Sequence, residues 1–139
     1  MSEIQLLNEF RNQIVGFLDE LIEQFPGSCA EFVIIRIFVK DQIPLADVLG
    51  RFISEVLPFK DIIKKRDSDF FLNSRVIYDA VGGAAAGSNN VNQLKKLWES
   101  ERLDDEDRET IWKWMDIFVF LAERYYKKFG AVPGWPVNK

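Results

Sequence analysis

The glycine-rich tract GGAAAGSNN comes nearest to a catalytic motif in this chain. Four residues separate Gly82 from Gly87, which is the glycine spacing of a phosphate-binding loop, where free backbone N–H groups at a helix start hold the anion. Ser88 and Asn89 then stand where that motif requires Lys followed by Ser or Thr. We therefore expect a flexible loop over residues 73–90. A small enzyme that handles phosphate with this loop stays open as an alternative.

Two other sets of side chains have the atoms for chemistry. Asp67, Asp69 and Asn73 offer oxygen atoms to a hard cation, but a calcium loop needs more oxygen ligands and a glycine at its turn. Cys29 is the single cysteine of a chain without histidine, so the usual activating base is missing. The lack of histidine also prevents a zinc site of the ordinary type. We expect no catalytic residue, metal or cofactor, and an enzyme based on carboxylates or lysines is the alternative.

The composition predicts one ordered domain inside a cell. The chain has 139 residues, of which 47% are hydrophobic and 14% aromatic, enough for a real core. Its net charge of −4 argues against non-specific binding to nucleic acid or to an anionic membrane. The lone Cys29 fits a reducing compartment, and the opening MSEIQLLNEF lacks the features of a signal peptide. We expect a cytoplasmic location.

The elements that must position any site are predicted to be helices. Residues 94–129 read as two helices joined by an acidic turn, with Asp104 capping the second and Gly130 ending it. Apolar residues of this last helix recur in steps of three and four: Ile111, Met115, Phe118, Ala122, Tyr125 and Phe129. Because about two-thirds of its circumference is apolar, we expect the helix to lie centrally and to touch at least two others.

Three earlier helices are predicted from caps and periodicity. Ser2 and Gln5 form a capping box that opens a helix reaching about residue 25. Pro44 suits the first turn of a helix, and Pro58 either closes that helix or kinks its end. The segment CAEFVIIRIFVKDQ is apolar nearly all round, which favours a central buried helix, although its β-branched residues leave a buried strand open over 32–39.

The fold class expected from these patterns is an all-α, single-domain bundle of five to seven helices. The helical domain spans residues 1–130, with the 73–90 loop outside it, and residues 131–139 form an irregular tail because they hold two prolines and no periodicity.

Two aromatic residues are candidate partner-binding anchors. The last helix places one face of charged residues toward solvent, namely Glu109, Lys113, Asp116, Glu123 and Lys127. Phe120 falls in the middle of that face, and Trp135 lies in the tail. The functional interpretation is an anchor for another protein or for a second copy of the chain, with which it would form a homodimer. The alternatives are an ordinary surface aromatic residue or, for Phe120, a residue covered by a neighbouring segment.

The chain also resembles a family of short, uncharacterised helical proteins encoded by large DNA viruses of algae and amoebae (nucleocytoplasmic large DNA viruses). The residues that carry the resemblance are Phe25-Pro26, Phe32, Pro44, Phe52, Val56, Pro58, Asp69-Phe70-Phe71-Leu72, Leu94, Trp98 and Ile111-Trp112-Lys113. It covers roughly residues 17–126 and does not extend to the glycine-rich tract or to Trp114. It implies a viral or environmental origin and action inside an infected host cell, without assigning any activity.

These observations favour an accessory or structural protein that acts by protein–protein interaction and is not an enzyme. Two other functions stay open. One is the small histidine-free enzyme described above, and the other is a peptide-binding module with an aromatic trough between helices.

Overall fold

The computed structural model describes residues 2–25, 30–67, 99 and 103–135, and every regular element within them is helical. The predicted all-α class is confirmed. In chain order the elements are α1 (Glu3–Gln24), α2 (Ala30–Ile37), the π-helical turn η2 (Phe38–Gln42), α3 (Leu45–Glu55), the 3₁₀ turn η3 (Leu57–Phe59), α4 (Lys60–Lys64) and α8 (Asp105–Phe129). The predicted 73–90 loop and all but residue 99 of the helix expected just before residue 100 lie outside the described residues.

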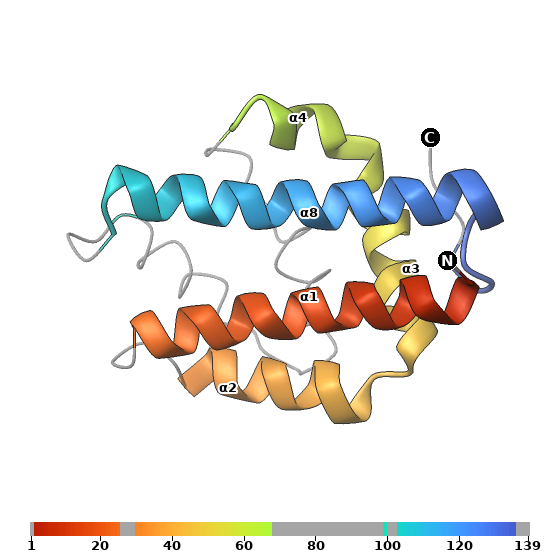
Figure 1. The fold of residues 1–139 in the computed structure, drawn as a ribbon, viewed down its shortest axis with the longest axis horizontal. Coiled ribbons are helices and arrows are strands. Elements are labelled where there is room, and N and C mark those ends of the chain that lie inside the picture. Colours follow the sequence, from red (N-terminus) through yellow and green to blue (C-terminus); the bar gives the residue numbers. More distant parts are fainter. Residues whose placement is uncertain (1, 26–29, 68–98, 100–102, 136–139) are drawn as a thin grey trace.

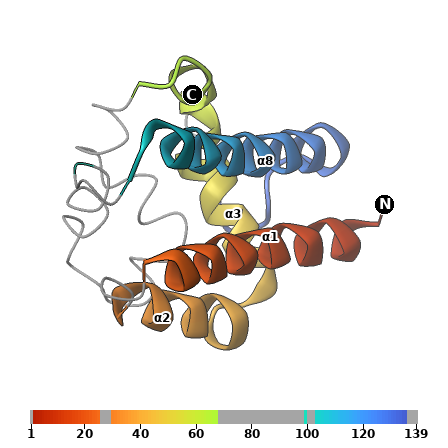
Figure 2. The same cartoon turned by 60° about the vertical axis from the view of Figure 1, so that its left-hand side comes forward.

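The long helices α1 and α8 form the middle of the molecule and run side by side in opposite directions (Figure 1). On the far side of α1 lies α2, and on the far side of α8 lies α4 (Figures 1 and 2). The helix α3 crosses behind this row and contacts both α1 and α8. Since α8 touches α1, α3 and α4, its predicted central position is confirmed.

Local sequence signals determine where α8 begins and ends. The Asp104 carboxylate accepts a hydrogen bond from the Asp107 N–H at 2.8 Å, and the Asp107 carboxylate accepts one from the Asp104 N–H at 3.2 Å. This capping box satisfies two N–H groups that the first turn leaves without partners. Gly130 ends the helix with a φ of 77°, a conformation that favours glycine. Both predicted ends of the helix are therefore confirmed.

A cluster of phenylalanines joins the three long helices. Phe10 and Phe17 of α1, Phe52 of α3 and Phe118 of α8 are all buried, and their ring centroids lie 5.2–6.1 Å apart in edge-to-face pairs. Each helix contributes these rings at helical spacing, so packing one face of each against the others buries the cluster. This cluster fixes the positions of α1, α3 and α8 relative to one another.

Helix α1 begins where the sequence predicts. The Gln5 N–H donates to the Ser2 hydroxyl at 3.2 Å, and the Ser2 N–H donates to the Gln5 side-chain oxygen at 2.8 Å. Helix α3 follows Pro44 and ends at Glu55, after which Pro58 lies in the 3₁₀ turn η3. These predicted boundaries are confirmed.

The position predicted for the second helix is wrong. The segment is helical, which settles the alternative of a strand over 32–39, but α2 lies at the edge of the molecule, where it packs on α1. Its buried side is Phe32, Ile35 and Val39, whereas Val33, Ile34 and Ile37 are 37–46% exposed. A helix that is apolar on all sides is predicted to be buried by neighbours on all sides. Helix α1, however, covers only one side of α2.

Candidate functional site

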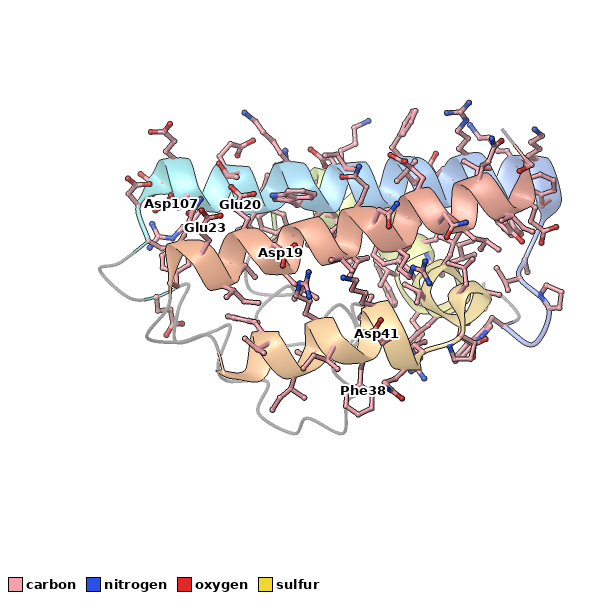
Figure 3. All side chains as sticks on the ribbon, turned by 60° about the horizontal axis from the view of Figure 1, so that its bottom comes forward. Asp19, Glu20, Glu23, Phe38, Asp41 and Asp107 are labelled. Atoms are coloured by element: carbon pink, nitrogen blue, oxygen red, sulfur yellow. The ribbon has the colours of Figure 1, made fainter. Side chains whose placement is uncertain are left out.

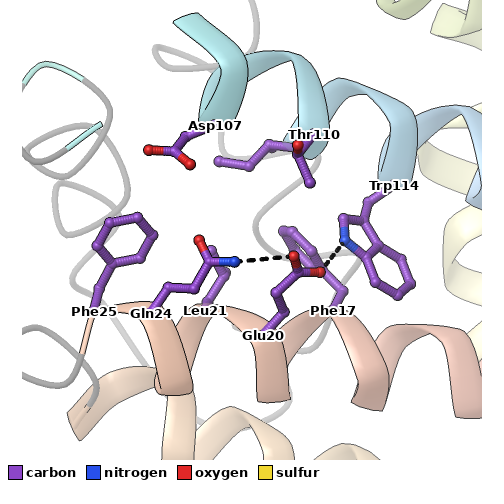
Figure 4. A pocket seen from close by; sticks show the side chains of 9 residues that line it. Phe17, Glu20, Leu21, Gln24, Phe25, Asp107, Thr110 and Trp114 are labelled. Carbon is purple, nitrogen blue, oxygen red and sulfur yellow. Dashed lines mark hydrogen bonds between the residues drawn. The ribbon is translucent and has the colours of Figure 1, made fainter. Parts of the chain in front are cut away.

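A pocket lies between α1 and the beginning of α8, and Figure 4 shows its lining. The Glu20 carboxylate lies at its wall, where it accepts hydrogen bonds from Trp114 Nε1 at 2.7 Å and from the Gln24 amide at 3.1 Å. The empty volume is about 260 Å³, but only about 10 Å³ of it admits the centre of a water molecule. That space is enough for a single water molecule, so this pocket is a packing gap rather than a ligand site.

Acidic side chains gather at the same end of the molecule. Figure 3 shows Glu20 and Glu23 near the end of α1 beside Asp107 at the start of α8. Within the described residues, however, no three acidic or cysteine side chains are placed so that they could hold a metal ion. The carboxylates of the first turn of α8 act as helix caps and interact with the positive end of the helix dipole.

The side of α8 that faces away from α1 and α3 carries the candidate site. We define the outer face of α8 as Glu109, Lys113, Asp116, Ile117, Phe120, Arg124 and Lys127, all of which are exposed. Phe120 lies in the middle of this face and is 63% exposed, while Ile117 beside it is 39% exposed. The structure therefore places Phe120 as the sequence predicts, as an aromatic side chain surrounded by charges.

Arg66 attaches the end of α4 to one edge of the outer face. Its guanidinium donates two hydrogen bonds of 2.8 Å to the two oxygens of Asp116 and a third of 3.2 Å to Glu109. The plane of Arg66 also lies over Trp112, 5.6 Å from the ring centroid. Hydrogen bonding to Asp116 raises the pKa of Arg66 further, so the guanidinium keeps its positive charge at every ordinary pH.

The backbone of Arg66 adopts the left-handed conformation that ends α4. Its φ is 59°, its N–H donates to the Ile63 carbonyl at 3.0 Å, and the Asp67 N–H donates to the Ile62 carbonyl at 3.2 Å. These two bonds are those of a Schellman motif, in which glycine usually occupies the position of Arg66. An arginine in this conformation is strained, and the strain persists because its side chain is held by α8.

A groove lies between α4 and α8. It has about 440 Å³ accessible to water and is lined by Lys60, Asp61, Ile63, Lys64, Asp116, Val119 and Glu123. Lys60 and Glu123 face each other across it at 3.6 Å. Because most of the lining is charged, this groove differs from the aromatic trough that a peptide-binding module requires.

The second predicted anchor, Trp135, lies against α3. Its indole N–H donates to Asp47 at 3.0 Å, the Arg51 guanidinium stacks 4.8 Å from its ring centroid, and its ring covers Gly50. A Cβ atom at Gly50 would lie only 2.4 Å from the indole ring. These contacts within the chain account for Trp135, whose role in partner binding stays a prediction.

Several candidates cannot be placed. Cys29, Asp69, Asn73 and the glycine-rich tract lie outside the described residues, and Asp67 is an exposed residue just after α4. In contrast, no local pattern indicates that Arg66 links α4 to α8, because 50 positions separate it from Asp116. Only the tertiary structure brings those two residues together.

The chain matches no protein family, no curated protein and no solved structure. Within the described residues, none of the helices combines the length and the hydropathy needed to pass through a lipid bilayer.

Proposed function

We propose that this chain is an accessory or structural protein that acts by binding another protein through the outer face of α8. The observation that carries the proposal is Phe120, which is 63% exposed on the helix that is otherwise packed most centrally. Binding hot spots are typically aromatic residues near the centre of an interface, surrounded by polar residues that exclude water. The charged residues around Phe120 would form such a rim.

The packing of α8 supports this choice of surface. Phe118, Met115 and Ala122 are buried on the opposite side of the helix, so replacing Phe120 leaves the core unchanged. Arg66 and Asp116 hold one edge of the face in a fixed geometry. A rigid surface loses little conformational entropy when a partner binds, which favours affinity.

For the setting of this function we propose the interior of an infected host cell. The support is the resemblance of residues 17–126 to the viral helical family. The chemistry of a histidine-free enzyme that uses the glycine-rich loop stays a prediction, because that loop lies outside the described residues.

Photo-crosslinking from position 120 tests the binding proposal. In the full chain, Phe120 is replaced by p-benzoylphenylalanine, an aromatic residue that forms covalent bonds with neighbouring C–H groups on irradiation. The matched control carries the same residue at position 4, because Ile4 is equally exposed at 65% but lies on α1. We expect crosslinked peptides from one defined partner, foreign or identical, at position 120 only. Equal labelling from both positions, or none from position 120, would overturn the proposal.

A further inference from the structure

The exposed charges of α8 are distributed unequally along the helix. Asp105, Glu106, Glu109 and Asp116 lie in its first half together with Lys113. Exposed cations follow in the second half, at Arg124, Lys127 and Lys128. Even with Arg66 bound to Asp116 and Glu109, exposed acids outnumber cations around the first half of α8. The second half carries the exposed cations, and Ile117 and Phe120 lie between the two ends. A surface of this kind is complementary to itself when two copies lie antiparallel.

The positions of two charges strengthen this symmetry. Lys127 follows Glu109 by 18 residues, which is about five full turns, so both side chains lie on one line along the helix. The midpoint of that line is at the level of residue 118. Phe120 lies only about 20° away from the same line, close to its midpoint. A two-fold axis at this level would bring each Glu109 opposite a Lys127 of the other copy.

We propose that the partner bound by the outer face of α8 is a second copy of this chain, packed antiparallel across a two-fold axis near residue 118. This inference rests on the proposed function and specifies its partner. Each copy completes the site of the other, because it supplies the Phe120 ring at the centre and the opposite charge at both ends.

The apolar centre fits this arrangement. Phe120 stands two residues beyond the level of the axis, so the two symmetry-related rings are about 6 Å apart along the helices. Aromatic pairs prefer ring centroids about 4.5–7 Å apart, in offset or edge-to-face geometry. Ile117, which is 39% exposed, lies one residue before the axis and adds apolar area beside the rings. The interface would thus cover the two exposed apolar residues of the outer face.

The cations of the outer face are available for this contact. Lys113, Arg124 and Lys127 form no ion pair with any residue in the described part of the chain. Glu109 is bound by Arg66 through one oxygen only, and its side chain is 49% exposed. Its second oxygen can therefore accept a hydrogen bond from Lys127 of the other copy.

Light scattering over a wide range of protein concentrations tests the proposal. At low salt we expect the mass of a dimer at high concentration and of a monomer on dilution, with weaker association at high salt because the end contacts are screened. Phe120→Ser should abolish the dimer, whereas the control Ile4→Ser, at a residue of equal exposure, should leave it unchanged. Circular dichroism confirms that both variants keep the wild-type helix content.

Charge reversal tests the antiparallel geometry. Glu109→Lys and Lys127→Glu each place two like-charged pairs in the symmetric interface and should raise the dissociation constant about tenfold. The double variant Glu109→Lys/Lys127→Glu restores opposite charges at both ends and should return the constant to near the wild-type value. If each single change weakened the dimer only by disturbing the fold, the two effects on the dissociation constant would add up in the double variant instead of cancelling.

The outcomes separate this inference from the proposed function. A monomer at every concentration, or a dimer that resists both Phe120→Ser and the charge reversals, overturns the self-association. If position 120 then crosslinks to one foreign protein, the outer face is still a binding surface. If the chain is monomeric and position 120 crosslinks to nothing, both proposals fail.

Discussion

Tyr125 shows how a single polar group is accommodated in the core of this molecule. Its ring is 1% exposed, and its hydroxyl donates a hydrogen bond of 2.7 Å to the Glu3 carboxylate at the beginning of α1. Burial, followed by the hydrogen bond to Glu3 and the charge of that carboxylate, raises the pKa of Tyr125 to about 12. While it is protonated, the hydroxyl therefore joins the end of α8 to the beginning of α1.

This raised pKa predicts a loss of stability at alkaline pH. In the unfolded chain the Tyr125 hydroxyl ionises near pH 10, whereas in the folded chain it keeps its proton up to about 12. Between these values the folded state binds more protons, so the free energy of unfolding falls as the pH rises. The contribution of the Tyr125 hydroxyl to the free energy of unfolding is complete below pH 10. This contribution should decrease by about 2 kcal/mol as the pH approaches 12.

Urea unfolding at a series of pH values measures this effect, with Tyr125→Phe as the comparison. The Phe variant keeps the ring in the core and removes only the ionisable hydroxyl, so its stability should depend less on pH in this range. In an absorbance titration, an ionisation step near pH 12 should be present in the wild type and should vanish in the variant. Identical alkaline profiles for both proteins would contradict the assignment.

At the scale of the element, Arg66 makes two opposing contributions to the stability of the end of α4. Its side chain binds Asp116 and Glu109 on α8, while its backbone holds the left-handed conformation with a φ of 59°. The side chains of these ion pairs are about 30–50% exposed. Solvent therefore reduces the stabilisation by both ion pairs together to about 1 kcal/mol. The backbone strain is of similar size.

Two substitutions separate these contributions. Arg66→Ala loses the ion pairs and keeps the strain, whereas Arg66→Gly loses the ion pairs and removes the strain. We expect the Gly variant to be more stable than the Ala variant by about 1 kcal/mol in chemical denaturation. High salt should reduce the difference in the free energy of unfolding between the wild type and each variant, because it screens the ion pairs. It should leave the difference between the two variants unchanged. An Ala variant as stable as the Gly variant would show that the backbone at residue 66 is relaxed.

At the scale of the whole molecule, Trp135 connects the end of the described chain to α3. Its partner Asp47 lies 88 positions earlier, and the ring covers Gly50 so closely that a Cβ atom there would lie 2.4 Å from it. Glycine is otherwise an unfavourable residue in the middle of a helix such as α3. Its presence at position 50 is explained by the space that Trp135 occupies.

A double-mutant cycle tests this long-range contact. In the wild-type background Gly50→Ala should destabilise the protein by about 1–3 kcal/mol, because the methyl group collides with the indole. In a Trp135→Ala background the same change should stabilise it by about 1 kcal/mol, because alanine is the better helix former. The free energies of unfolding of the four proteins provide the cycle. If Gly50→Ala changed the free energy of unfolding with the same sign in both backgrounds, Trp135 would not cover Gly50 in solution.

Local patterns in the sequence determined the helices and their ends. The capping boxes at Ser2 and Asp104 and the glycine at position 130 depend on residues within one turn of each other, so the sequence displays all the groups involved. The all-α class and the central place of α8 follow equally from the width of its apolar stripe. Phe120 could be identified as exposed because the charged residues that surround it lie on the same helix face.

Only the tertiary structure decided which helix covers which surface. The apolar pattern of α2 predicts burial on every side, but a single neighbouring helix such as α1 can cover only one side, and Val33, Ile34 and Ile37 stay exposed at the edge. The contacts of Arg66 with Asp116 and of Trp135 with Gly50 join residues far apart in the chain, and no local pattern encodes such pairs. Periodicity specifies which faces are apolar, whereas the neighbours of each face depend on the lengths and directions of all the helices packed together.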